Sequence, residues 1–165
     1  MKLYVLRHGP AEDHAESGVD ADRALTASGR ERVRAVARAL EQADETPVLV
    51  FTSPLARAVQ TAEIVALVTK IGDRDGTVEV RRELAPGGHA VGLARHLAAE
   101  GRKRVMFVGH EPDLSGLVGS LLGAFGHPFD KAMVVSLQVA TDRGRSKLRF
   151  VLDPRTLALH PDHRA

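Results

Sequence analysis

The chain has 165 residues and a formal net charge of +2, which predicts a single domain, residues 1–165, large enough for a full hydrophobic core. It has no cysteine, so disulfides and thiolate metal sites are excluded, and nothing in its composition indicates export. Because the basic residues are scattered along the predicted helices and only 4% of residues are aromatic, we expect no nucleic-acid partner.

The first predicted strand, residues 2–6, is a short apolar run that ends in Arg7, His8 and Gly9. Its leucine, tyrosine and valine content favours a buried position in a sheet. The run is too short for a signal peptide or a membrane span, so we expect no membrane contact and a cytoplasmic location. Arg7 and His8 are expected at the rim of the sheet, where open α/β folds bind ligands. Gly9 allows a sharp turn or a close approach to a ligand.

Residues 10–25 are acidic and interrupted by glycine, which predicts a surface loop. Since the loop directly follows His8, we expect it to form one wall of the site. A helix is predicted from residue 27 to about residue 43, because its apolar residues recur at helical spacing and its opposite face is charged. Thr26 is the expected N-cap of this helix.

A second apolar strand is predicted at residues 48–52, followed by Ser53 and Pro54. Serine favours a helix N-cap and proline favours the first helical position, so we expect a helix from here to about Lys70. Arg57 then lies in the first turn of that helix. Arg57 is therefore expected close to the end of the strand and to the helix N-terminus. A helix N-terminus itself favours an anion.

The second half of the chain continues the alternation of strands and helices and then changes to strands alone. We expect an edge strand at 77–80, a helix at 89–100, a strand at 105–108, a helix at 114–122 with Asp113 as its N-cap, and strands at 132–140 and 147–152 joined by a hairpin at 142–145. Residues 154–165 are expected to form an exposed tail. This order predicts a three-layer α/β/α sandwich with a mostly parallel central sheet and an antiparallel edge strand.

Three of the predicted strands deliver arginine or histidine to their C-terminal ends. If these strands are parallel, Arg7, His8, Arg57 and His110 meet in one small volume at one edge of the sheet. Cations crowd together only at a cost, and the ligand that offsets this cost is a dianion such as phosphate. Neighbouring cations keep His8 neutral, and a neutral imidazole nitrogen is a nucleophile toward phosphorus. The remaining cations would stabilise the phosphoryl oxygens, so we expect neither a metal nor another cofactor.

The motifs that carry these residues resemble the signature of a known family. They are Leu6-Arg7-His8-Gly9, Ser53-Pro54-Leu55-Ala56-Arg57-Ala58-Val59-Gln60-Thr61-Ala62 and Val108-Gly109-His110-Glu111. Their order and spacing resemble the histidine phosphatase superfamily, also called the phosphoglycerate-mutase-like superfamily, over roughly residues 2–152. The resemblance implies that His8 is the phosphorylated nucleophile and that Arg7, Arg57 and His110 form the phosphate pocket.

Within that superfamily the chain is similar to the small phosphohistidine phosphatase branch, because the stretch 71–88 is short and no capping segment is evident. Arg23 matches this branch and is expected to contact phosphate. Many members place an acidic or amide residue after Arg-His-Gly, whereas this chain has Pro10, which leaves the general acid open. Glu83 lies near the place where larger relatives carry a proton donor, and a simple ion pair with Arg81 or Arg82 is the alternative.

Several substrates remain compatible with this pattern. The favoured one is phosphohistidine on a signalling protein, such as a histidine phosphotransfer domain, because a compact chain without a cap suits a phosphorylated side chain. A small-molecule phosphomonoester, such as a sugar phosphate or a nucleotide, is the alternative. A non-catalytic phosphoprotein-binding module is disfavoured because binding alone does not need His8, and a mutase is disfavoured because it needs a closed pocket. The sequence does not indicate whether the protein is a monomer or an oligomer.

Overall fold

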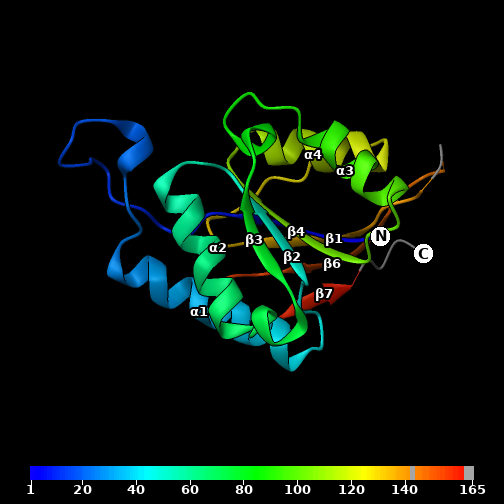
Figure 1. Cartoon of the computed structure of the whole chain (residues 1–165), viewed down its shortest axis with the longest axis horizontal. Helices are drawn as coiled ribbons and strands as arrows, with labels where there is room; N and C mark the ends of the chain where they lie inside the picture. The colour runs from blue at the N-terminus through cyan, green and yellow to red at the C-terminus, as the bar shows by residue number, and fades with distance from the viewer. Residues whose placement is uncertain (142–143, 162–165) are drawn as a thin grey trace.

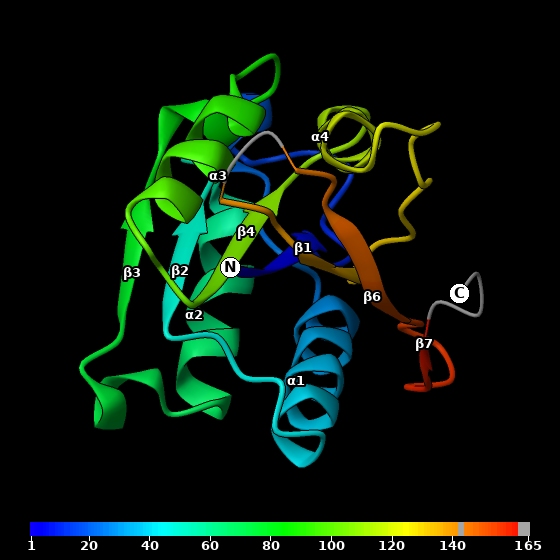
Figure 2. The ribbon, with the colours of Figure 1, turned by 90° about the vertical axis from the view of Figure 1, so that its right-hand side faces the viewer.

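The computed structural model of the chain describes residues 1–141 and 144–161. A central sheet is covered by two pairs of helices, one pair on each face (Figures 1 and 2). The helices are α1 (Ala27–Gln42) and α2 (Ala56–Val68) on one face, and α3 (Ala90–Ala99) and α4 (Asp113–Leu122) on the other. Short 3₁₀ helices η1 (Asp20–Asp22), η2 (Ile71–Arg74) and η3 (Arg82–Leu84) lie in the connections. The α/β fold is therefore the one that the sequence predicts.

The described residues contain seven strands in the order β3-β2-β4-β1-β5-β6-β7. These strands are β1 (Lys2–Arg7), β2 (Leu49–Thr52), β3 (Thr77–Val80), β4 (Arg104–Gly109), β5 (Val134–Gln138), β6 (Lys147–Leu152) and β7 (Leu159–Pro161). The four strands from β3 to β1 are parallel to one another, and β5, β6 and β7 follow as antiparallel neighbours. Because β1, β2 and β4 are parallel and adjacent, their C-terminal ends share one edge of the sheet, as the sequence predicts.

The alternation of side chains along the central strands separates two hydrophobic cores. Leu3 and Val5 of β1 face α3 and α4, whereas Tyr4 and Leu6 face α1 and α2, and all four side chains are fully buried. Burial of each such side chain contributes about 1.5–3 kcal/mol. Both sides of β1 are therefore fixed by packing, which holds the residues that follow it in a defined position.

Three sequence-based predictions differ from the structure. The helix expected from Ser53 begins only at Ala56, with Leu55 as its N-cap. Asp113 is the first residue of α4 and Pro112 is the N-cap. The chain after β6 is not a free tail as far as residue 161, since β7 pairs with β6 and Pro154 is buried.

Other expectations about the second half are met: β3 and β6 have the predicted bounds, α3 and β5 are shorter, and β4 and α4 are longer. Strand β3 lies at the edge of the sheet, and β5 pairs antiparallel with β6. The predicted hairpin at 142–145 falls partly on residues 142–143, which lie outside the described residues. Within the part of the chain that the structure describes, no helix combines the length and apolar character that crossing a bilayer requires.

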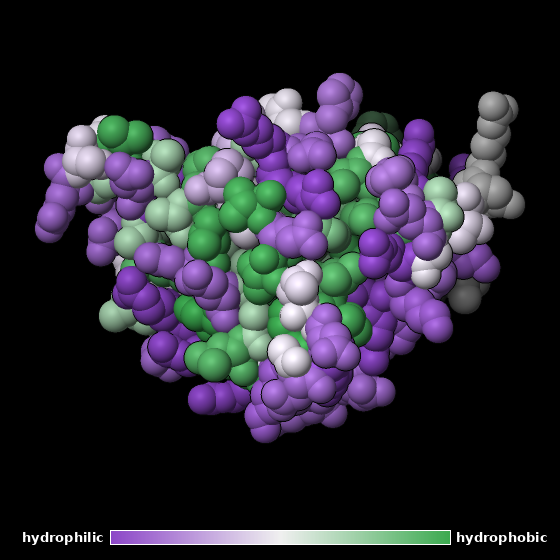
Figure 3. Space-filling model, viewed as in Figure 1, coloured by the Kyte–Doolittle hydropathy of each residue, from purple (hydrophilic) through white to green (hydrophobic). Residues whose placement is uncertain are grey.

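The face of the molecule seen in Figure 3 mixes apolar and hydrophilic residues, with apolar residues gathered in the region of β3 and α2. The exposed apolar side chains in these elements are Leu67, Val78 and Val80. All four residues of β3 are exposed. The candidate site residues lie at the C-terminal ends of the inner strands and in the first turn of α2.

Candidate active site

The ends of three parallel strands bring the catalytic candidates together. Arg7 is the last residue of β1, and the amide of His8 donates to the Gly109 carbonyl at the end of β4 at 3.1 Å. The amide of Ser53, after β2, donates to the Val108 carbonyl at 3.0 Å. The rings of His8 and His110 consequently lie with their centroids 5.1 Å apart.

One nitrogen of His8 is left free to react. Its Nδ1 lies 2.7 Å from the Gly9 carbonyl, and because a carbonyl can only accept, Nδ1 carries the proton and Nε2 keeps its lone pair. Burial lowers the pKa of His8 to about 3 against the opposing hydrogen bond to Gly9, and the charges of His110, Arg57 and Arg7 lower it further. His8 is therefore a neutral imidazole, only 7% exposed, in the state that a nucleophile requires.

His110 is held by a serine from the neighbouring strand. Its Nε2 lies 2.8 Å from the Ser53 Oγ. Burial lowers the pKa of His110 to about 4, and the charge of Arg57 acts in the same direction, whereas Asp113 and Asp20 oppose it. Its Nδ1 is buried and has no hydrogen-bond partner among the described residues. An unpaired buried donor or acceptor costs about 1–3 kcal/mol, which makes this nitrogen a natural contact for a bound oxyanion.

We expect these two pKa values to make the protein less stable in mild acid. Between the unfolded pKa of about 6.5 and the lowered native value, the unfolded chain binds a proton that the native state does not, so stability falls as the pH falls. At pH 5, which is about 1.5 units below 6.5, each histidine lowers the free energy of unfolding by about 2 kcal/mol. Urea denaturation at pH 7 and pH 5 measures this change.

The His8→Ala variant serves as the comparison for that experiment. Its loss of stability between pH 7 and pH 5 should be smaller than that of the wild type by about 2 kcal/mol. An identical loss in the two proteins would mean that His8 titrates normally in the native state. The variant His96→Ala, at an exposed position on α3, is the matched histidine-to-alanine control.

Arg7 is fixed by the loop that precedes β5. Its Nη1 donates to the Phe129 carbonyl at 2.6 Å, and the Phe129 amide donates to the Glu111 Oε1 at 2.7 Å. Glu111 also accepts from the Ser115 hydroxyl. Because Glu111 directly follows His110, one carboxylate ties the loop that holds Arg7 to the turn that carries His110. Two distant segments are thereby fixed relative to each other.

Arg57 is almost fully buried, at 5% exposed, and is held by the loop that follows β1. It donates through Nη1 to the Asp20 carbonyl at 2.9 Å and through Nη2 to the Asp20 carboxylate at 3.1 Å. The other oxygen of that carboxylate accepts from Arg23 Nε at 2.8 Å. The carboxylate of Asp20 therefore bridges two guanidinium groups, and their hydrogen bonds lower the pKa of Asp20. The structure therefore connects Arg23 to the site through Asp20.

The candidate site residues are largely buried, although the sequence shows no capping segment. His8, Arg57 and His110 are each at most 7% exposed, and η1 lies against α2 through Asp20. Sequence reasoning missed Asp20 because loop residues carry no periodicity that indicates where their side chains point. The one feature of the sequence that could have indicated Asp20 is the acidic character of residues 10–25, which lie next to a cluster of cations.

The small residues of the motifs have roles in packing as well as in hydrogen bonding. A Cβ on Gly9 would lie 2.6 Å from Val33 Cγ2, so this glycine lets α1 approach the end of β1. The Gly9 amide donates to Thr61 Oγ1 at 3.1 Å, and Thr61 donates to the Arg57 carbonyl at 2.7 Å. Ser53 Oγ accepts from the Leu55 amide at 3.3 Å and also contacts His110, while α2 begins only at Ala56.

Glu83 differs from the other predicted site residues. It lies in η3 and lines a groove of about 330 Å³ together with Leu93 and Leu97 of α3. Neither Arg81 nor Arg82 pairs with it, and Arg81 instead forms an ion pair with Glu79 at 3.1 Å. The carboxylates that influence His110 are Asp113 and Asp20. Among the described residues, Glu83 forms no hydrogen bond or ion pair with His8 or His110.

The comparisons with known proteins agree with this geometry. A sequence profile of the histidine phosphatase superfamily (branch 1) matches residues 3–85. A relative in Picosynechococcus, itself uncharacterised, is 38% identical over 150 residues and covers 87% of this chain and 88% of its own. The chain belongs to the histidine phosphatase superfamily. Its Arg7-His8-Gly9 and Arg57 lie inside the matched segment, whereas His110 lies beyond it.

Three further comparisons concern the branch of the superfamily and the fold. The phosphohistidine phosphatase SixA of Escherichia coli is 27% identical over 165 residues, covering 96% of this chain and 98% of its own. A solved structure of the protein histidine phosphatase SixA complexed with tungstate superposes with a TM-score of 0.86 at 27% identity, covering 96% of this chain and all of that one. A mycobacterial glucosyl-3-phosphoglycerate phosphatase shares the fold at a TM-score of 0.66 and 20% identity, over 89% of this chain and 96% of its own.

Proposed function

We propose that this protein is a metal-independent phosphatase that removes the phosphoryl group from phosphohistidine on a protein, through a phosphohistidine intermediate on His8. The observation that carries the proposal is the free Nε2 of a buried, neutral His8 beside His110 and two guanidinium groups. The likeness of the whole chain to SixA supports the protein substrate. We further propose that residues 1–165 act as one catalytic domain in cytoplasmic signalling.

In the first step, Nε2 of His8 forms a bond to phosphorus while the bond from phosphorus to the substrate imidazole breaks. Arg7, Arg57 and His110 would bind the equatorial oxygens and stabilise the charge of the transition state. In the second step, water attacks phosphorus, the bond to His8 breaks and inorganic phosphate leaves. The guanidinium groups supply the positive charge for which other phosphatases use a metal ion. Arg23, bridged to Arg57 by Asp20, is proposed to join them when phosphate binds.

The leaving group explains how this site can work without a strong general acid. An imidazole departs from phosphorus more readily than an alkoxide does, so a phosphohistidine substrate depends less on protonation in the transition state. Among the described residues, Glu83 lines a separate groove and forms no hydrogen bond or ion pair with either histidine, which agrees with a substrate of this kind. A phosphoserine or sugar phosphate substrate would instead require a well-placed proton donor.

The proposal is tested by comparing release of phosphate from a phosphohistidine peptide and from a phosphoserine peptide of the same sequence. We expect the phosphohistidine peptide to react faster by at least about 10²-fold, the usual contribution of general acid catalysis that the phosphoserine reaction lacks. Initial rates of phosphate release give the two values of kcat/KM. Equal or faster release from phosphoserine would contradict the proposed substrate.

A further inference from the structure

A basic pocket beside the phosphoryl site is not used by the mechanism described above. It has a volume of about 320 Å³ and is lined by Arg7, Pro10, Arg32, Asp130, Lys131, Pro154 and Arg155. Its walls come from the end of β1, from α1, from the loop before β5 and from the turn after β6. At about 30 Å³ per water molecule, the pocket has room for an oxyanion and the group that carries it.

The charge of the pocket is strongly positive. Four of its side chains are cationic and one, Asp130, is a carboxylate. That carboxylate is already paired with Arg155 at 3.1 Å. Arg32 and Lys131 form no ion pair with any of the described residues, although other arginines on the surface, such as Arg34, have an acidic partner. Cations that share a pocket without a counter-charge favour an anionic ligand.

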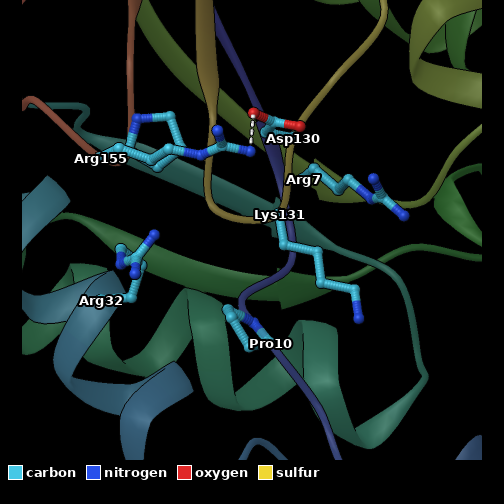
Figure 4. Close-up of a pocket in the computed structure, with 7 residues that line it drawn as sticks. Arg7, Pro10, Arg32, Asp130, Lys131 and Arg155 are labelled. Carbon is cyan, nitrogen blue, oxygen red and sulfur yellow. Dashed lines mark ion pairs between the residues drawn. The ribbon is translucent and has the colours of Figure 1, made fainter.

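The position of the pocket connects it to the reacting group. Arg7 lines it and also precedes His8, while Pro10 follows Gly9. Figure 4 shows Arg32 and Arg155 on one side, Arg7 and Lys131 on the other, and the ion pair between Arg155 and Asp130 at the rim. A ligand in this pocket would therefore lie next to a phosphoryl group held by Arg7.

We propose that this pocket binds a second oxyanion of the substrate, a carboxylate or phosphate carried beside the phosphoryl group that is removed. The proposal rests on the phosphatase function proposed above, since Arg7 joins the two sites. On a phosphoprotein the second oxyanion would be an acidic side chain near the phosphohistidine. On a small molecule it would be a second phosphate. Both groups suit the arginine and lysine donors of the pocket.

The double variant Arg32→Gln/Lys131→Gln tests the pocket while leaving Arg7 and the Arg155 ion pair in place. Both side chains are exposed and without an ion-pair partner in the described residues, so the variant should fold. Its kcat/KM is compared with that of the wild type on phosphohistidine peptides that carry either two glutamates or two glutamines beside the phosphohistidine. A second pair of substrates is a sugar bisphosphate and the matching monophosphate.

In the wild type, we expect the peptide with glutamates to have a kcat/KM about 5- to 10-fold higher, mainly through a lower KM. The double variant should bring this ratio close to one, and added salt should reduce it in the wild type. The control Arg38→Gln/Lys103→Gln removes the same charge from exposed positions outside the pocket and should keep the ratio. A collapse of the bisphosphate ratio alone would support the pocket and assign it a small-molecule oxyanion.

If the double variant changes neither ratio, the pocket does not bind a second oxyanion and the inference is wrong. This result is distinct from failure of the proposed function, which is read in the wild type alone. A wild-type enzyme that releases phosphate from phosphoserine at least as fast as from phosphohistidine would reject the proposed substrate. The bisphosphate ratio would still test the pocket in that case.

Discussion

Replacing His8 with alanine should lower kcat by about 10⁴–10⁶-fold, the range seen when a catalytic nucleophile or its partner is removed from an enzyme that works through a covalent intermediate. The expected loss follows from the free Nε2 of His8, which the variant lacks. Incubation with a radiolabelled phosphoryl donor, followed by denaturation, measures the intermediate directly. The wild type should retain an acid-labile label and the His8→Ala variant should not.

The control for this experiment is His96→Ala, because His96 is exposed on α3 and, among the described residues, forms an ion pair only with Glu100. It should keep both the label and the activity of the wild type. Thermal unfolding at pH 7 establishes that each variant is folded. If His8→Ala retains as much label as the wild type, another residue is the nucleophile, and the proposed chemistry does not occur at His8.

Replacing Arg57 with alanine should lower kcat/KM by about 10²–10³-fold, the usual cost of removing one preorganised donor from a developing negative charge. The side chain is 5% exposed, and its Nε has no hydrogen-bond partner among the described residues. Its hydrogen bonds to Asp20 orient the guanidinium before a substrate binds. Steady-state kinetics on a phosphohistidine peptide measure the loss.

A second variant keeps the Arg57 prediction independent of folding. Arg57→Lys retains the charge but loses the planar fork of the guanidinium, so it should recover only part of the activity. Inorganic phosphate at 100 times its Kd should stabilise the wild type by about 2.7 kcal/mol, and this stabilisation should be much smaller in both variants. Arg38→Ala, at an exposed position on α1, is the matched control. Full activity in a folded Arg57→Ala protein would contradict the role assigned to this residue.

The four central site residues could be predicted from the sequence because each lies in a regular element or directly follows one. Strands β1, β2 and β4 are apolar runs that end abruptly in polar residues, and parallel strands bring such ends to one edge. Arg57 was placed correctly in the first turn of α2 even though the helix begins later than expected. Strand pairing and helical spacing are periodic, so the positions of these residues follow from the pattern.

The contacts made by loops could not be predicted in the same way. Asp20 reaches Arg57 across 37 positions of the chain, and the Phe129 carbonyl reaches Arg7 across 122. Neither contact depends on a repeating pattern. The pairing of β7 with β6 was missed because two prolines in the last segment favour an exposed tail, although a proline at the end of an edge strand is compatible with a sheet.

The place of β1 in the sheet has a consequence for how the protein is made. This strand is synthesised well before its two neighbours: it pairs on one side with β4 and on the other with β5, which follow a hundred or more residues later. Until then the nascent chain leaves both edges of an apolar strand unpaired, a state prone to aggregation. The first half of the sequence carries His8, the proposed nucleophile, but release of the chain before residue 138 would leave β1 without its full pairing to β5.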